Sequence, residues 1–122
     1  MSIIFENKNI KIETESSEIP WLKIFTQHPY KEMNEVPGLV KFEIYYLLDI
    51  IEKEMLAYYK ADKINIASFG NYVPHVHWHI MARFKEDSYF PEPMWGTKQR
   101  TSNLTLPSFE VFCTQLKEVL NG

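Results

Sequence analysis

The residues of this chain with the greatest chemical potential lie in segment 75–79. It reads His-Val-His-Trp-His, so three imidazoles alternate with two large apolar side chains. Successive side chains of a β-strand point to opposite faces, so a strand here would place His75, His77 and His79 on one surface, above an apolar support. The chain has only one other histidine and a single cysteine. We therefore look for the function at this segment first.

One use for a row of imidazoles is metal binding, because imidazole is the commonest metal ligand among side chains. Along a strand, however, His75 and His79 would lie roughly 13 Å apart, whereas zinc needs each ligand nitrogen about 2.0 to 2.1 Å away. A metal site would therefore need His28 or an acidic residue from elsewhere, and nothing in the sequence spacing requires one. We predict no metal ligands. A metalloenzyme and a purely structural role for the histidines remain alternatives.

A second use is nucleophilic attack at phosphorus. The unperturbed pKa of imidazole is about 6.5, so much of it is neutral near pH 7, and phosphorylated imidazole is a good leaving group for water. The middle residue, His77, suits the attack. Flanking imidazoles could hold the non-bridging oxygens and help the leaving oxygen to depart. Upstream, the Gly70-Asn71 pair adds backbone N–H groups of the kind that cradle an anion.

The order of strands and helices around this segment indicates an antiparallel α+β fold. Between residues 39 and 60, apolar side chains recur at helical spacing with charged residues opposite them. The predicted strands are Ile3–Glu6, Ile10–Thr14, Trp21–Thr26, Lys63–Phe69 and Val76–Arg83, the predicted helices are Leu39–Lys60 and Ser108–Leu120, and Asp87–Ser102 is a predicted loop. Strands, helix, strands and helix in this order favour an antiparallel sandwich over a wound parallel sheet.

The long predicted helix has a second apolar row, formed by Phe42, Tyr46 and Ile50. Burial of each such side chain is worth roughly 1.5 to 3 kcal/mol, so a second row predicts a second packing partner. One interpretation is a homodimer. The other is that the C-terminal segment of the same chain covers the row.

Length and composition set limits on the class of protein. The 122 residues, 45% of them apolar, suffice for one domain that spans residues 1–122. The formal charge of −3 comes from 13 basic and 16 acidic residues without a long block of either sign, so we expect no polymeric nucleic acid as partner. No run has the length of a membrane span or a signal peptide, and a single cysteine cannot form an intramolecular disulfide. We expect no membrane partner and a reducing, cytoplasmic setting.

The histidine segment carries a resemblance to a known family. The seven residues 75–81, His-Val-His-Trp-His-Ile-Met, match the His-φ-His-φ-His-φ-φ signature of the histidine triad (HIT) family of nucleotide hydrolases and transferases, where φ is apolar. The segments 19–22 (Ile-Pro-Trp-Leu), 63–71 (Lys-Ile-Asn-Ile-Ala-Ser-Phe-Gly-Asn) and 90–96 (Phe-Pro-Glu-Pro-Met-Trp-Gly) also resemble a bacterial branch of this family. The resemblance implies a five-stranded antiparallel sheet flanked by helices, and a homodimer.

The resemblance also implies roles for individual residues. His77 would be the nucleophile that takes up a nucleotidyl group from an α-phosphate, while His75 and His79 would bind phosphate oxygens and orient it. A second set would contact the nucleotide. Asn71 and Gly70 would lie at the phosphate, Asn65 or Ser68 would offer a polar phosphate contact, and Glu15 would accept hydrogen bonds from ribose hydroxyls, unless it is a solvated turn carboxylate.

Three departures from the family pattern limit what the resemblance implies. The segment that helps to form the base pocket in relatives has no counterpart before Ile3, so the base preference is open. Paired N-terminal cysteines are missing, so no structural zinc is implied. Relatives often carry a basic residue after a proline where this chain has His28, which we expect to be an exposed turn histidine. The sequence does not decide whether Trp95 folds over the site or packs against a partner subunit.

These inferences predict a nucleotide hydrolase or transferase that works through a nucleotidyl-histidine. Suitable substrates are dinucleoside polyphosphates, such as diadenosine polyphosphates, and nucleoside phosphoramidates. No metal or other cofactor is obligatory for the attack, though Mg²⁺ could accompany a polyphosphate. The alternative is a nucleotide-binding module with negligible turnover.

Overall fold

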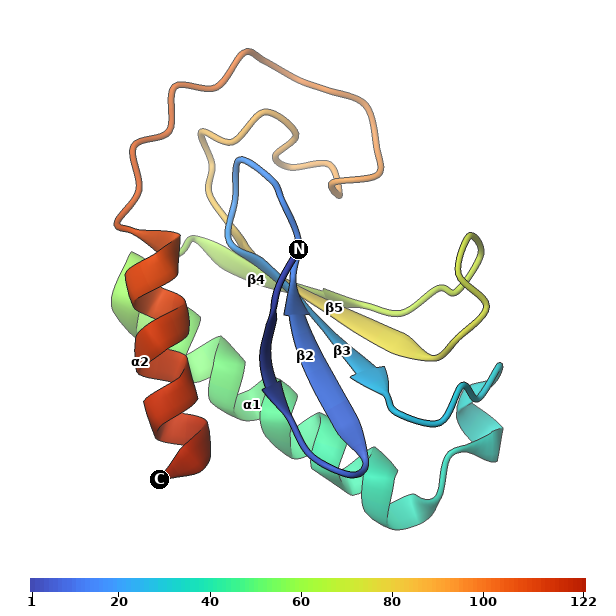
Figure 1. Cartoon of the computed structure of the whole chain (residues 1–122). Coiled ribbons are helices and arrows are strands. Elements are labelled where there is room, and N and C mark those ends of the chain that lie inside the picture. The colour runs from blue at the N-terminus through green and yellow to red at the C-terminus, as the bar shows by residue number, and fades with distance from the viewer.

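Five antiparallel strands form the sheet that carries the histidine segment (Figure 1). The computed structural model describes residues 1–122. The spatial order of the strands is β1-β2-β3-β5-β4. Their bounds are Ile3–Glu6 (β1), Ile10–Thr14 (β2), Trp21–Thr26 (β3), Lys63–Ala67 (β4) and His77–Arg83 (β5). The predicted α+β class, with its five-stranded antiparallel sheet, is confirmed.

Two strand boundaries differ from the prediction at the turn before the histidines. β4 ends at Ala67 instead of Phe69, and β5 begins at His77 instead of Val76. The backbone N–H of Val76 donates to the carbonyl of Tyr30, at 2.7 Å, in the connection that follows β3. On the β4 side, the hydroxyl of Ser68 donates to the carbonyl of His77 at 2.6 Å. The chain therefore leaves the regular ladder just ahead of the strand.

Helix α1, Gly38–Tyr59, packs on one face of the sheet and supplies much of the core. Its bounds lie within a residue of the predicted ones. Lys60 ends the helix in the left-handed conformation, with φ of 56°. The helix buries Tyr59 and all the apolar positions that predicted it: Val40, Ile44, Leu47, Leu48, Ile51 and Met55. Opposite them in the sheet, the side chains of Ile24 and Ile80 are fully buried.

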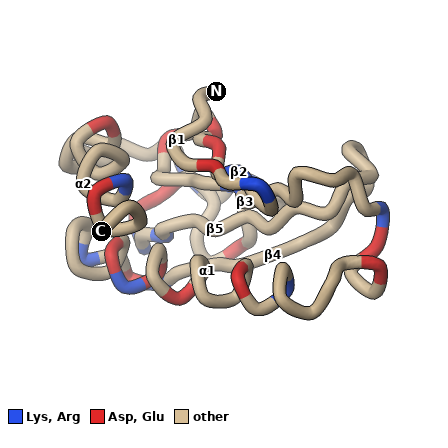
Figure 2. The backbone as a smooth tube through the Cα atoms, turned by 60° about the horizontal axis from the view of Figure 1, so that its bottom comes forward, with Lys and Arg blue, Asp and Glu red and all other residues tan.

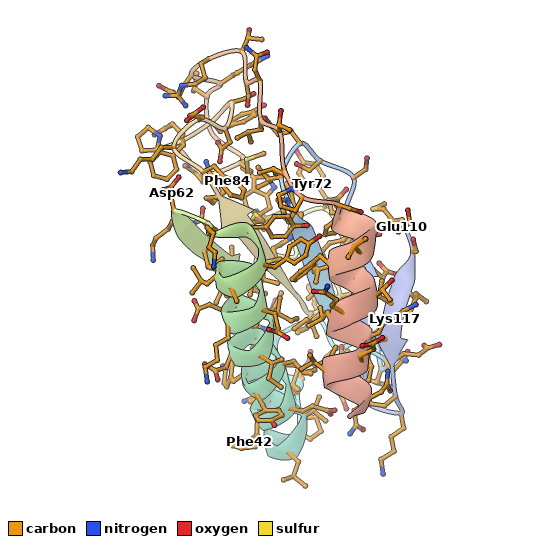
Figure 3. The ribbon with its side chains drawn as sticks, turned by 90° about the vertical axis from the view of Figure 1, so that its left-hand side faces the viewer. Phe42, Asp62, Tyr72, Phe84, Glu110 and Lys117 are labelled. Atoms are coloured by element: carbon orange, nitrogen blue, oxygen red, sulfur yellow. The ribbon has the colours of Figure 1, made fainter.

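Helix α2, Phe109–Asn121, closes the chain beside α1 (Figure 3). The hydroxyl of Ser108 accepts a hydrogen bond from the backbone N–H of Val111 at 3.1 Å, which caps the N-terminus of the helix. The helix buries Phe112 and Leu116. A short 3-10 helix at Met33–Glu35 was not predicted, because three residues carry no periodicity that could be recognised.

The C-terminal segment does not cover the whole second apolar row of α1. The side chains of Phe42 and Tyr46 are 70% and 58% exposed, and Figure 3 shows Phe42 near the N-terminal end of α1. Ile50 is partly buried against the core. At the other end of α1, the hydroxyl of Tyr58 donates to the carbonyl of Ser108, so α2 lies against the C-terminal half of the helix. One copy of the chain thus leaves Phe42 and Tyr46 without a packing partner.

Charges of both signs are distributed over the strands and helices (Figure 2). Neither helix combines the length and the apolar character that a membrane span requires.

Candidate active site

The face of the sheet opposite α1 holds the candidate site. In the register of β3 and β5, Phe25 lies opposite His77 and Lys23 lies opposite His79, so all four side chains share this face. They border a cavity of about 330 Å³. Its lining comprises Glu15, Lys23, Phe25, Phe69, Gly70, Asn71, Tyr72, Val73, His77, His79 and Trp95.

His77 lines the cavity, and one of its two ring nitrogens is hydrogen-bonded within the protein. Nδ1 lies 2.7 Å from the backbone carbonyl oxygen of His75. A carbonyl oxygen can only accept, so Nδ1 carries the proton and Nε2 of the neutral ring keeps its lone pair. The ring also stacks on Phe25, with centroids 4.8 Å apart and planes 19° apart. His77 therefore combines a fixed ring with an unprotonated nitrogen, as a nucleophile requires.

His79 is the second imidazole in the cavity wall. The indole Nε1 of Trp21 lies 3.0 Å from its Nδ1. Burial, with smaller contributions from the nearby His77 and Lys23, lowers the pKa of His79 to about 4, against the opposing effect of Glu15. His79 is consequently neutral at pH 7.

His75 does not lie in the strand with the other two histidines. Its Nε2 lies 2.6 Å from the carbonyl oxygen of Thr26 and 3.2 Å from the hydroxyl of the same residue, and the side chain does not line the cavity. The expectation of three imidazoles on one strand face is therefore wrong for His75, because β5 begins after it. The group of His75 that contacts His77 is its backbone carbonyl.

The predicted anion-binding turn lies at the rim of the cavity. Gly70 and Asn71 both line it, followed by Tyr72 and Val73. Gly70 has φ of 77°, a left-handed conformation that glycine adopts without the penalty of a Cβ atom. The turn is thus placed beside His77 and His79, as the sequence predicted.

Ser68 and Asn65 are not brought to the cavity. The hydroxyl of Ser68 donates to the backbone of His77, and the side-chain oxygen of Asn65 accepts a hydrogen bond from Arg83 at 2.7 Å. Asn65 lies opposite Met81 in the ladder, so it does share the face of the histidines. Its amide is engaged by Arg83 instead. Both residues join β4 to β5 in this structure.

Glu15 lies in the cavity wall as an ion pair and not as a solvated carboxylate. Its Oε1 is 3.0 Å from the ammonium nitrogen of Lys23. The second carboxylate oxygen has no hydrogen-bond or ion-pair partner in the protein, so it can accept hydrogen bonds from a ligand. His28 packs against Tyr30 and does not line the cavity.

The sequence and the overall structure were compared with known proteins. The HIT-domain family model matches residues 13–86, more than half of the chain and the part that holds both cavity histidines. The chain belongs to the HIT-domain family. Proteins of this family are nucleotide-binding hydrolases and transferases. The comparison with curated proteins finds no match.

Solved structures of HIT proteins superpose on this HIT domain over nearly its whole length. A histidine triad protein from Bradyrhizobium japonicum is 26% identical, with a TM-score of 0.78 over 96% of this chain and 88% of that one. A histidine triad protein from Sinorhizobium meliloti is 25% identical, with a TM-score of 0.77 over 95% and 87% of the two chains. One from Marinobacter aquaeolei, 21% identical, shares the fold with a TM-score of 0.74, over 98% of this chain and 85% of that one.

The sequence analysis missed five residues that line the cavity of the HIT domain: Lys23, Phe25, Phe69, Tyr72 and Val73. It also missed Trp21, whose indole reaches His79 from outside the cavity lining. Alternation along β3 places Trp21, Lys23 and Phe25 on one face, which is a signal the sequence does hold. Whether that face is the one with the histidines depends on how β3 pairs with β5. Some fifty residues separate the two strands in the chain, so local alternation does not reveal this pairing.

Trp95 folds over the site of this HIT domain within the same chain. Its ring lies 4.9 Å from that of His79, 4.8 Å from Phe69 and 5.3 Å from Trp21, each in an edge-on arrangement. The sequence left open whether Trp95 covers the site or meets a partner subunit, and the structure places it over the site.

A buried ion pair anchors the loop that carries Trp95. Arg83, at the end of β5, donates from Nε and Nη2 to the two carboxylate oxygens of Asp87, at 2.9 and 3.1 Å, and also to the carbonyl of Glu92 at 2.7 Å. Burial alone would raise the pKa of Asp87. The Arg83 guanidinium and three backbone N–H donors outweigh that effect and hold this pKa below its usual value.

No group of three or more His, Cys, Asp or Glu side chains lies close enough together to hold a metal ion. The site of this HIT domain contains two imidazoles, one ammonium group and backbone N–H donors, and groups of these kinds bind phosphate.

Proposed function

We propose that this HIT domain is an enzyme that cleaves a nucleotide at its α-phosphate through a covalent nucleotidyl intermediate on His77. The observation that carries the proposal is the hydrogen bond from His77 Nδ1 to the carbonyl of His75 at 2.7 Å. It leaves the lone pair of Nε2 available in a cavity that also contains phosphate-binding groups.

The reaction takes place in two displacement steps. In the first, the Nε2 lone pair of His77 attacks the α-phosphorus, and the bond from phosphorus to the leaving group breaks with its electron pair on that group, which takes a proton from solvent water when it is an amine. In the second, water attacks the same phosphorus and releases a proton to the solvent, the bond from phosphorus to Nε2 of His77 breaks, and the mononucleotide leaves with the oxygen of that water. The electron pair returns to Nε2. Another acceptor in place of water would make the enzyme a transferase.

The other cavity residues take roles that fit their positions. His79 and the backbone N–H groups at Gly70 and Asn71 stabilise the negative charge on the transferred phosphoryl group. Lys23 adds a positive charge beside them, and Glu15 offers its free oxygen to ribose hydroxyls. His75 acts through its carbonyl group, which orients His77.

The substrates we propose are dinucleoside polyphosphates and nucleoside phosphoramidates, because both carry a leaving group on an α-phosphate. The scheme has no obligatory metal, and Mg²⁺ would enter with a polyphosphate substrate as its counterion. We propose a cytoplasmic enzyme, in keeping with Cys113, which is buried and free.

We also propose that the enzyme is a homodimer in which α1 contributes to the interface. Support comes from Phe42 and Tyr46, two of the large apolar side chains of α1 that one copy of the chain leaves exposed. Large exposed apolar side chains that cluster on one surface are typical of protein interfaces.

Turnover and binding measured together test the proposed enzyme. We expect the wild-type protein to hydrolyse diadenosine polyphosphate or adenosine phosphoramidate, and His77→Ala to lose on the order of 10³-fold or more in kcat, since the nucleophile is gone. Mononucleotide binding, measured by calorimetry, should survive in His77→Ala. His28→Ala, the same change outside the cavity, should keep full activity.

Two outcomes would contradict this proposal. Undiminished turnover in His77→Ala would refute the nucleophile. Tight mononucleotide binding by a wild-type protein that turns over neither class of substrate would favour the alternative, a nucleotide-binding module without enzymatic activity.

A further inference from the structure

The indole of Trp21 determines which nitrogen of His79 carries a proton. Nε1 of Trp21 lies 3.0 Å from Nδ1 of His79. An indole N–H can only donate, so Nδ1 of His79 must accept. A neutral imidazole has one proton, which is then on Nε2. We propose that Trp21 is a positioning residue that holds His79 as the neutral Nε2–H tautomer, so that His79 presents a fixed hydrogen-bond donor to the phosphoryl group.

A second proton on His79 would break this arrangement. The doubly protonated ring carries an N–H on Nδ1, which would face the N–H of Trp21 with no acceptor between them. The groups around the ring add to this effect. His77 and Lys23 disfavour a positive charge on His79, Glu15 is the facing group that favours one, and the loop above contributes the uncharged ring of Trp95. Burial, with smaller contributions from His77 and Lys23, outweighs Glu15 and lowers the pKa of His79 to about 4.

This tautomer gives His79 one role in the reaction. Its Nε2–H can donate to an oxygen of the transferred phosphoryl group throughout the neutral pH range, without a change of charge. It has no second proton to release there, so it does not serve as the general acid for the leaving group. The role in turnover rests on the proposed function, whereas the tautomer itself is a property of the unliganded protein.

The chain provides a matched pair of residues for the test. Trp21 and Trp95 both lie edge-on to the His79 ring, with centroids 5.7 and 4.9 Å away. Only Trp21 donates a hydrogen bond to it. Trp21→Phe and Trp95→Phe each replace an indole by a phenyl ring beside the same imidazole, and only the first removes the donor.

Nitrogen-15 NMR of the histidine rings, recorded between pH 4 and pH 8, tests the tautomer directly. We expect the wild-type protein and Trp95→Phe to show His79 protonated on Nε2 alone down to about pH 5. In Trp21→Phe, we expect a mixture of tautomers and a titration that begins at least one pH unit higher. On the acid side of the pH profile, kcat of Trp21→Phe should then begin to fall at a pH that is higher than in the wild-type protein by the same amount. The pH profile of Trp95→Phe should keep the wild-type shape.

Three results would overturn the inference. A wild-type His79 that carries its proton on Nδ1 would refute it without any variant, even if Trp21→Phe fails to fold. Trp21→Phe with an unchanged tautomer and titration would show that the indole does not control the ring. A changed tautomer with an unchanged pH profile of kcat would refute the role in turnover. A wild-type protein without turnover would count against the proposed function and leave the NMR result standing.

Discussion

His75, His77 and His79 have the same side chain but three different hydrogen-bond partners. Nε2 of His75 is held by Thr26, Nδ1 of His77 by the carbonyl of His75, and Nδ1 of His79 by Trp21. Each partner determines which ring nitrogen is left for a ligand. The lone pair of His77 and the Nε2–H of His79 are complementary, since one attacks phosphorus while the other donates to its oxygens.

The lowered pKa of His79 predicts how stability depends on pH. Its pKa is about 4 in the folded protein and near 6.5 in the unfolded chain, so between these values the unfolded chain binds more protons. The contribution of His79 to stability is therefore complete well above pH 6.5 and decreases as the pH falls through this range, by an amount on the order of 3 kcal/mol. It changes no further below about pH 3, where both states are protonated.

Urea unfolding of His79→Gln at several pH values between 4 and 7 measures this contribution. We expect the free energy of unfolding of the variant to fall less than that of the wild-type protein over this range. His28→Gln should follow the wild-type curve. Parallel curves for His79→Gln and the wild type would contradict the lowered pKa.

Lys23 and Lys11 form a matched pair around Phe25. Each ammonium group lies over the Phe25 ring, at 5.7 and 5.4 Å, and each pairs with a carboxylate, Glu15 at 3.0 Å and Glu13 at 3.2 Å. Only Lys23 lines the cavity. Lys23→Met should weaken mononucleotide binding about tenfold, as expected for one charge-assisted hydrogen bond.

Calorimetry at one fixed ionic strength provides the comparison, and Lys11→Met should change the dissociation constant less than about twofold. Equal losses in the two variants would show that Lys23 acts through the general charge of the sheet and does not contact the ligand.

At the scale of elements, the loop after β5 is held by the ion pair of Arg83 and Asp87, whose side chains are 2% and 0% exposed. Asp87→Asn keeps the shape of the side chain but leaves the buried guanidinium without its counter-charge. Loss of one partner of a buried pair costs about 3 to 5 kcal/mol. We expect a decrease of this size in the free energy of unfolding, measured with urea.

Asp49→Asn is the control, because it removes the carboxylate of an exposed pair with Lys53, at 3.1 Å on the surface of α1. Its effect should stay below about 1 kcal/mol. An Asp87→Asn variant as stable as Asp49→Asn would contradict the anchoring role of the buried pair.

The elements themselves were predictable from local patterns. Alternation and helical spacing predicted all five strands and both helices, and the turn at Gly70 and Asn71 was placed correctly beside the histidines. The missed features depend on pairing across the sheet. Asn65 has the right face for a phosphate contact, but Arg83, eighteen residues away, takes its amide oxygen. Lys23 and Phe25 join the site through the register of β3 with β5, which no local pattern contains.

At the scale of the whole molecule, the exposed apolar surface of α1 predicts self-association. We expect sedimentation equilibrium at micromolar concentration to give twice the mass of one chain. Phe42→Glu combined with Tyr46→Glu should give the mass of a single chain, because charges would be buried in the interface. Lys98→Glu, on an exposed position of the loop after β5, should leave the mass unchanged. A wild-type protein with the mass of one chain would contradict the dimer.

The central claim for the whole molecule is that a nucleotidyl group is bonded to His77 during turnover. The most direct measurement is rapid mixing of the protein with diadenosine polyphosphate, a quench in alkaline denaturant, and mass spectrometry of the digested chain. We predict a nucleotidyl group on the peptide that contains residues 75–79, located on His77 by fragmentation and missing in His77→Ala. Turnover without any adduct, or an adduct located on His75 or His79, would contradict the account.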